Sequence, residues 1–254
     1  GEVEKILSMR FNRTVRIVGA GRTDAGVHAR GSAFHFDCFK GELLDDSSIQ
    51  HLQHSMNRML QKEIIVWNLQ QAPLATIHTT SNGTTATFPW HVIYYSQRKL
   101  YSYRICTSPA MDPLERYTRH HVDWGNVNIS LLNETLHKFE GTHDFRAFSG
   151  AVEQKQKKEQ KSVNTVRTVY QVSLVEESQG LYRIDILLKG ALYKMIRNMV
   201  GTAIDVARGR MSPESFLQLL LHPNAQFVRD DNPCKPAPPQ GLTLERVYFD
   251  DEDF

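Results

Sequence analysis

The chain has 254 residues, of which 41% are hydrophobic, and its formal net charge is +2. This composition predicts a folded chain with a packed core and excludes one that is disordered throughout. The three cysteines lie far apart and form neither a zinc-binding pattern nor a disulfide framework, so we expect no metal site and a reducing compartment. No apolar run reaches membrane-spanning length and no secretory signal is visible, so no membrane partner is expected.

The first part of the chain predicts two helices, three strands and a long loop. Residues 1–12 predict an amphipathic helix that is already in progress at residue 1, so we expect that upstream residues are missing. Three apolar runs predict strands, at residues 14–18, 32–37 and 64–69. Ser47 predicts the N-cap of a helix whose apolar residues recur at helical spacing. The threonine-rich residues 72–89 predict a polar loop at the boundary between two halves.

The second part of the chain predicts four strands and three helices. The strands are expected from alternating or β-branched residues at 101–105, 166–175, 182–188 and 242–249. Two helices are expected from apolar residues at helical spacing, over residues 131–139 and 192–207. Ser212, followed by Pro213, predicts the start of a third helix. The highly charged residues 154–161 have no apolar anchor and predict a loop.

A glycine-rich loop, VGAGRTDAGVHA at residues 18–29, carries a carboxylate near its centre. Asp24 replaces the third glycine of a dinucleotide-binding G-x-G-x-x-G, and Val27 replaces the lysine of a P-loop. A carboxylate among inward-pointing amides would repel a phosphate, so we expect no nucleotide cofactor. The glycines predict a sharp turn that presents Asp24 as a reactive group, with Arg22 two residues before it. The alternative is a turn in which Asp24 caps a helix and Arg22 is solvated.

Six segments together resemble the motifs of the tRNA pseudouridine synthase A family. They are GRTDAGVHA (21–29), RKLYSYRI (98–105), GTHDFRAF (141–148), VRTVYQVSL (166–174), LYKMIRNMVGTAI (192–204) and APPQGLTLERVYF (237–249). These segments occur in family order and span nearly the whole chain. The chain departs from the family in lacking an early strand with a Tyr-Asp-Gly turn. Val92 and Ile93 stand within the usual His-Ala-Arg segment, and Ala191 replaces a phenylalanine.

The resemblance implies an α/β (α+β) fold made of two pseudo-twofold-related halves. Their mostly antiparallel sheets would join into one central sheet with helices on one side, and a basic cleft would run between the halves. The N-terminal half, residues 1–88, would carry the catalytic aspartate and lack its first strand. Residues 89–254 would form the C-terminal half. The family also implies a homodimer that binds tRNA.

The resemblance further implies an isomerase that converts uridine to pseudouridine in the anticodon stem-loop of tRNA, at positions 38–40. This reaction gains and loses no atoms and needs no energy donor, so no cofactor is expected. Asp24 would act as a nucleophile or help to remove a ribose proton. Arg22 and Arg197 would place positive charge near Asp24 and favour its ionised form.

The resemblance also implies which residues contact the target nucleotide. The nucleotide must leave the helical stack, and stacking on an aromatic ring offsets part of that cost. Tyr101 matches the family's stacking tyrosine, whereas strand periodicity alone permits Tyr103 equally. Leu242 is expected on the other side of the base, and Thr23 and His28 are expected beside the substrate.

Two other functions stay open from the residues. The chain would be a tRNA-binding remnant without activity if the first half could not place Asp24. A hydrolase with paired carboxylates is disfavoured, because no motif supplies a second acidic residue for Asp24. We expect a cytoplasmic protein, with the matrix of a mitochondrion or plastid as the alternative, since a transit peptide would lie upstream.

Overall fold

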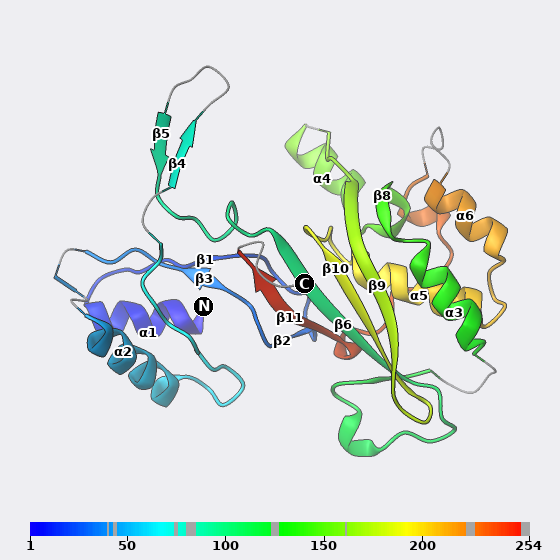
Figure 1. Cartoon of the computed structure of the whole chain (residues 1–254), viewed down its shortest axis with the longest axis horizontal. Helices are drawn as coiled ribbons and strands as arrows, with labels where there is room; N and C mark the ends of the chain where they lie inside the picture. Colours follow the sequence, from blue (N-terminus) through cyan, green and yellow to red (C-terminus); the bar gives the residue numbers. More distant parts are fainter. Residues whose placement is uncertain are drawn as a thin grey trace. The chain divides into compact units, whose positions relative to one another are not determined.

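A computed structural model describes residues 1–39, 41–42, 45–73, 76–79, 85–122, 127–160, 162–221 and 227–249 (Figure 1). The chain divides into two compact units. Unit 1 comprises Gly1–Gly21 and Ala33–Tyr95, and unit 2 comprises Arg22–Ser32 and Ser96–Phe254. The segment that contains Asp24 therefore groups with the C-terminal part of the chain. The expected division of the fold into two symmetric halves with a cleft between them stays a prediction.

In its described residues, unit 1 combines two helices with two small sheets. Its elements are α1 (Glu2–Phe11), α2 (Asp46–Met59), β1 (Val18–Gly19), β3 (Phe34–His35), β4 (Thr76–Thr79) and β5 (Thr85–Phe88). Strand β1 pairs antiparallel with β3, and β4 pairs antiparallel with β5. The two helices pack together (Figure 1) over a core whose buried members are Ile6, Leu7, Val15, Leu52, Met56, Leu60 and Val66. The expected opening helix is confirmed.

The strand expected over residues 14–18 is wrong except at its last residue, where β1 begins. Side chains of α1 take the backbone hydrogen bonds that a neighbouring strand would otherwise use. The Val15 amide donates to Ser8 Oγ over 2.9 Å, and the Ile17 amide donates to Glu4 Oε1 over 3.3 Å. An apolar run can therefore be extended and buried without joining a sheet.

The strand expected over residues 64–69 is also wrong, for the same kind of reason. The Val66 amide donates to Asn57 Oδ1, and the Leu69 amide donates to Gln53 Oε1, both over 2.7 Å. Both acceptors lie on α2, so this segment is bound to a helix through side-chain amides rather than to another strand.

Two further predictions for unit 1 are corrected. Asp45, not Ser47, is the N-cap of α2, and its Oδ1 accepts from the Ser48 amide over 2.8 Å. The segment 72–89, expected to be a loop, contains the paired strands β4 and β5. Threonine is β-branched and favours extended backbone, and this preference outweighs the polarity of the segment.

Within the described ranges, seven strands form a mixed sheet at the centre of unit 2 (Figure 1). They are β2 (His28–Ala29), β6 (Arg98–Cys106), β7 (His120–His121), β8 (Gly141–Asp144), β9 (Val166–Ser178), β10 (Leu181–Leu188) and β11 (Leu242–Tyr248). The order is β2-β11-β6-β10-β9-β8, and β7 also pairs with β6. The β2–β11 and β6–β7 pairs are parallel and the others antiparallel. The four strands predicted for the second part are confirmed.

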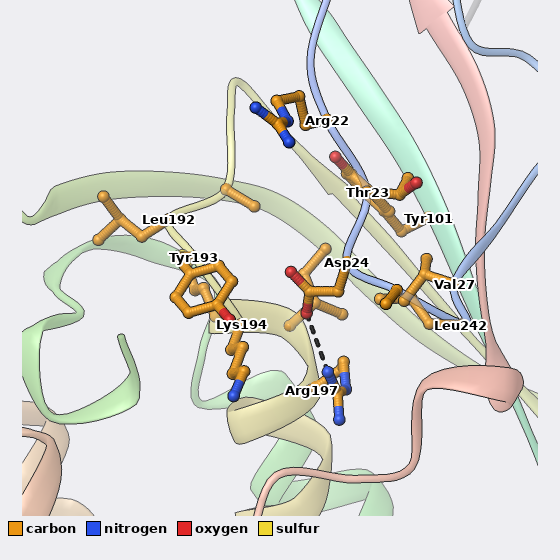
Figure 2. A pocket seen from close by; sticks show the side chains of 14 residues that line it. Arg22, Thr23, Asp24, Val27, Tyr101, Leu192, Tyr193, Lys194, Arg197 and Leu242 are labelled. Atoms are coloured by element: carbon orange, nitrogen blue, oxygen red, sulfur yellow. Dashed lines mark hydrogen bonds and ion pairs between the residues drawn. The ribbon is translucent and has the colours of Figure 1, made fainter. Parts of the chain in front are cut away.

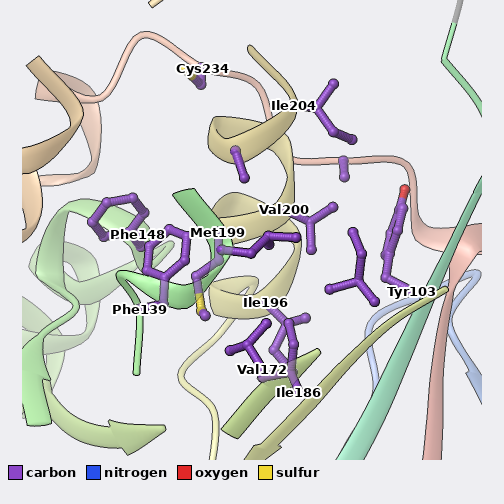
Figure 3. Close-up of a cluster of buried hydrophobic side chains, with 14 of the residues drawn as sticks. Tyr103, Phe139, Phe148, Val172, Ile186, Ile196, Met199, Val200, Ile204 and Cys234 are labelled. Carbon is purple, nitrogen blue, oxygen red and sulfur yellow. The ribbon is translucent and has the colours of Figure 1, made fainter. Parts of the chain in front are cut away.

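The described helices of unit 2 are α3 (Ile129–His137), α4 (Val152–Glu159), α5 (Met195–Ala207) and α6 (Pro213–Leu221). Buried residues of α3, α5 and α6 share one core cluster with residues of β6, β9 and β10 and so cover one face of the sheet. Figure 3 shows Ile196 and Val200 of α5 in one cluster with Val172 of β9 and Ile186 of β10. The predicted apolar stripe is therefore core, and its two methionines, Met195 and Met199, are fully buried.

Strand β6 shows why its alternating residues predicted a strand correctly. Tyr103 and Ile105 are fully buried among the core residues. Arg104, between them, faces the other side of the sheet and pairs with Glu245 at 3.1 Å and Glu177 at 3.5 Å. Successive side chains of a strand point to opposite faces, so this pattern separates core from ionic surface.

Two predictions for unit 2 are corrected. Residues 154–161 were expected to form a loop, but α4 covers most of them, since glutamine, lysine and glutamate favour helix and the buried Val152 provides an anchor. Helix α5 begins at Met195 rather than at residue 192, because Lys194 has the left-handed φ of 58°. The mixed α/β class is confirmed. None of the described helices is long and apolar enough to cross a membrane.

Candidate active site

A cavity of about 470 Å³ in unit 2 gathers six of the seven predicted site residues (Figure 2). Its walls come from the glycine-rich loop, the segment that leads into α5, and the strands β6 and β11. The predicted residues that line it are Arg22, Thr23, Asp24, Tyr101, Arg197 and Leu242. Segments far apart in the sequence thus converge on one hollow, as expected of a binding site.

The loop presents Asp24 through a tight turn. The Val27 amide donates to the Asp24 carbonyl over 3.1 Å. Gly26 has a φ of 80°, which a residue with a Cβ adopts only with strain, and a Cβ there would lie 3.0 Å from Pro239 Cγ. The turn leads into strand β2 rather than a helix, so Asp24 does not act as a helix cap. The sharp glycine turn expected here is present, and Asp24 projects into the cavity (Figure 2).

Asp24 and Arg197 form an ion pair in the cavity wall. Arg197 Nη1 donates to Asp24 Oδ2 over 2.9 Å. The two side chains are only 12% and 17% exposed, for Arg197 and Asp24 respectively, so the pair is shielded from solvent. A charge-assisted hydrogen bond of this kind fixes the carboxylate in one orientation. No residue in the described part of the chain donates to Oδ1 of Asp24, which leaves that oxygen accessible to a substrate.

A second contact holds the Arg197 side chain in place. Its Nε donates to the Ala237 carbonyl over 2.8 Å, and the Ala237 amide donates back to the Arg197 carbonyl, also over 2.8 Å. Gly201, one turn further along α5, permits this approach. A Cβ at Gly201 would overlap the Lys235 carbonyl and lie 2.9 Å from the Ala237 nitrogen. Hydrogen bonds to its side-chain Nε and to its backbone carbonyl therefore hold Arg197 in place before any substrate binds.

Tyr101 and Leu242 lie on neighbouring strands of the sheet and contribute to the apolar lining of the cavity. Burial raises the pKa of Tyr101 to about 12, and the negative charge of Asp24 acts in the same direction. The phenol is therefore neutral at physiological pH. Leu242 is 6% exposed and offers an aliphatic surface.

Tyr103, the alternative to Tyr101, is a core residue. Its hydroxyl donates to the Pro238 carbonyl over 2.8 Å, and burial raises its pKa. Its ring fills the space beside Gly241, where a Cβ would lie 2.7 Å from the ring carbon Cζ. Tyr103 does not line the cavity, so of the two tyrosines only Tyr101 is placed to meet a ligand there.

The other predicted site residues differ in position. Arg22 lines the cavity with an exposed side chain, but no ion pair joins it to Asp24 in the described residues. Thr23 lines the cavity beside it. His28 lies in β2 outside the cavity lining, and its Nε2 is 2.5 Å from the Tyr117 carbonyl oxygen. Substrate contact by His28 stays a prediction, and its observed contact is with the chain itself.

Among the lining residues that were not predicted as site residues, two carry polar groups. Tyr193 and Lys194 immediately precede α5, and the lysine Nζ lies 5.2 Å from the centre of the tyrosine ring. Their closeness in sequence to Arg197 was the signal that could have found them. Among the described residues, no group of three or more histidine, cysteine, aspartate or glutamate side chains is arranged to hold a metal ion.

Comparisons with known proteins show which family the chain belongs to. A family model described as tRNA pseudouridine synthase matches residues 136–250. The tRNA pseudouridine synthase A of Listeria innocua is 31% identical, over 98% of this chain and 88% of its own length. The protein of that name from Geobacillus kaustophilus is 32% identical, over 99% and 85%. The tRNA pseudouridine synthase A 1 of Protochlamydia amoebophila is 30% identical, over 94% and 82%. The chain therefore belongs to the tRNA pseudouridine synthase A family, whose members are isomerases.

Proposed function

We propose that the chain converts uridine to pseudouridine in the anticodon stem-loop of a tRNA, without a cofactor, and that Asp24 performs the chemistry. The observation that carries this proposal is the Asp24–Arg197 ion pair in the wall of a cavity that also contains Tyr101 and Leu242. The reaction rearranges one nucleotide and exchanges no atoms with a second substrate. It therefore needs a site for a single nucleotide with one reactive carboxylate, and a cavity of about 470 Å³ lined by Asp24 supports such a site.

The walls of the cavity suit a nucleotide that has left the helical stack. Tyr101 supplies an aromatic surface, and Leu242 supplies an aliphatic one. Stacking on an aromatic ring contributes roughly 1–3 kcal/mol per base, which offsets the few kcal/mol that base flipping costs. Because Tyr101 stays neutral up to high pH, it holds the base without donating or accepting charge.

Asp24 has the properties that the reaction requires of its catalytic group. Arg197 engages one carboxylate oxygen, and the other, which accepts no hydrogen bond from the described residues, would face the ribose and base of the bound uridine. This oxygen acts either as a nucleophile or as the base that removes a ribose proton. The positive charge of Arg197 balances the negative charge of the Asp24 carboxylate while the charge on the bound nucleotide changes during the reaction.

The choice of RNA substrate and the assembly rest on the resemblance of the motifs to the family. We propose that the target uridines lie at positions 38–40 and that the protein acts as a homodimer. Stem-loop transcripts in which each of these positions in turn is the only uridine provide the test. Pseudouridine is mapped in each product after incubation with the purified chain, and RNA affinity is measured in parallel.

The expected result is pseudouridine at one or more of these positions, together with RNA binding. Binding without product, in a chain that unfolds cooperatively, would contradict the proposed activity and favour a tRNA-binding remnant. On a full-length tRNA transcript, product only at uridines outside the anticodon stem-loop would contradict the proposed target and leave the proposed chemistry intact.

A further inference from the structure

The charges around the cavity do not balance. Four charged side chains line it, namely Arg22, Asp24, Lys194 and Arg197. The ion pair neutralises Asp24 with Arg197. Neither Arg22 nor Lys194 forms an ion pair with any acidic side chain in the described ranges. A site with two uncompensated cations favours an anionic ligand.

Backbone hydrogen bonds, rather than an ion pair, fix the position of Lys194. Its φ of 58° is in the left-handed region, which lysine rarely adopts. The conformation is held because the Lys194 carbonyl accepts from the Asn198 amide over 2.9 Å and so starts α5. On the other side, the Tyr193 carbonyl accepts from the Gly150 amide, also over 2.9 Å. These bonds fix the backbone from which Lys194 contributes to the cavity lining.

The lysine ammonium keeps its hydrogen-bond donors available. Its one described contact is with the Tyr193 ring, whose centre lies 5.2 Å from Nζ. A cation over an aromatic face is attracted electrostatically without using a conventional acceptor. In Figure 2, Tyr193 and Lys194 lie on one side of the Asp24–Arg197 pair, and Val27 and Leu242 lie on the other. The ammonium thus belongs to a residue that lines the same cavity as Asp24, but it does not bind the Asp24 carboxylate.

We propose that Lys194 binds one of the two phosphodiester groups that flank the target uridine and so positions its ribose beside Asp24. This inference rests on the proposed function. A nucleotide within an RNA strand carries a phosphate on each side of its ribose, and a ligand seated on Asp24 and Tyr101 brings one of them to the cavity rim. Lysine is a compact, flexible cation with three donors and is suited to such a contact. Lys194 is therefore a substrate-binding residue, and it takes no part in proton transfer.

The test compares Lys194→Asn with the unchanged chain. Asparagine tolerates the left-handed backbone and is a good helix N-cap, so this variant removes the charge without disturbing the start of α5. We expect stem-loop affinity to fall about tenfold and the salt dependence of binding to lose roughly one phosphate contact. Most of the change in kcat/KM should appear in KM. Lys194→Arg should restore much of the affinity.

A neutral phosphate substitute locates the contact. Stem-loops are made with a methylphosphonate on the 5′ side or on the 3′ side of the target uridine, and their affinity is measured with both proteins. At the phosphate that Lys194 binds, the substitution should weaken binding to the unchanged chain about tenfold and have little effect on the variant. At the other phosphate, both proteins should lose affinity equally.

Lys189→Asn provides the matched control, because Lys189 is an exposed lysine nearby that does not line the cavity. Its affinity and salt dependence should match those of the unchanged chain. Equal losses for both proteins at both phosphates would overturn the Lys194 assignment. RNA binding without pseudouridine would contradict the proposed function, while the affinity comparison would still decide the role of Lys194. A chain that binds no stem-loop would contradict both proposals.

Discussion

Asp24 and Arg197 are separated by 173 positions in the sequence, yet Arg197 Nη1 lies 2.9 Å from Asp24 Oδ2. The carboxylate comes from the glycine-rich turn between strands β1 and β2, and the guanidinium comes from the first turn of α5. Their pairing in a shielded cavity wall brings the carboxylate and its counter-charge together before any ligand binds. The surrounding residues either hold this pair in place or line the cavity beside it.

Gly201→Ala should disturb the support of Arg197. The added Cβ would overlap the Lys235 carbonyl, which lies two residues before the carbonyl that binds Arg197 Nε. We expect the free energy of unfolding to fall by about 1–3 kcal/mol, and pseudouridine formation to slow as well. Urea denaturation measures the first effect. Gly190→Ala is the control and should be close to neutral, because no atom lies within 4 Å of its added Cβ. Equal stability of the two variants would contradict this account of the helix contact.

Tyr103→Phe should lower stability, whereas Tyr101→Phe should have little effect on it at neutral pH. The Tyr103 hydroxyl is buried and donates to the Pro238 carbonyl, and its removal leaves that carbonyl without its donor. The expected cost is about 1–2 kcal/mol. Thermal unfolding of the two single variants makes the comparison. A larger loss for Tyr101→Phe would show that the structural and ligand-facing roles have been assigned to the wrong tyrosines.

Tyr101 should make the stability of the protein depend on alkaline pH. Burial, with the charge of Asp24, raises the pKa of Tyr101 from 10.0 to about 12 in the folded state. Between pH 10 and pH 12, the tyrosine hydroxyl is deprotonated in the unfolded chain but still protonated in the folded chain. The free energy of unfolding therefore falls as pH rises through this range. From about pH 9 to 11, the unchanged chain should lose roughly 1.3 kcal/mol more than Tyr101→Phe. Denaturation at both pH values measures this. Identical losses in the two proteins would contradict the raised pKa of Tyr101.

Patterns within short segments predicted the elements that build the site. The alternation in β6 indicated a strand, the glycines before and after Asp24 indicated a turn, and the apolar stripe indicated the helix that carries Arg197. Each of these signals depends on the period of side-chain direction or on backbone freedom, which are local properties. The closeness of Asp24 and Arg197 is not local, and it was expected only from the resemblance of the motifs to a family.

The predictions that failed depended on partners that a local pattern does not contain. Residues 64–69 look like a strand, but Asn57 and Gln53 of α2 take their amides. Lys194 looks like a residue within a helix, but its left-handed backbone delays the start of α5 and turns its side chain toward the cavity. Hydrogen bonds to distant side chains and single unusual dihedral angles determine the structure of these segments. Neither produces a periodic pattern in the sequence.

The most direct test of the central claim is the rate of pseudouridine formation by Asp24→Asn, measured in single turnover on an anticodon stem-loop that the protein binds. Asparagine keeps the size of the side chain but supplies no carboxylate to react or to remove a proton. The account predicts that the rate falls to about one-thousandth or less, a loss of roughly 4 kcal/mol in transition-state stabilisation, while stem-loop binding persists. Turnover within a few-fold of the unchanged chain would contradict the assignment of the chemistry to Asp24.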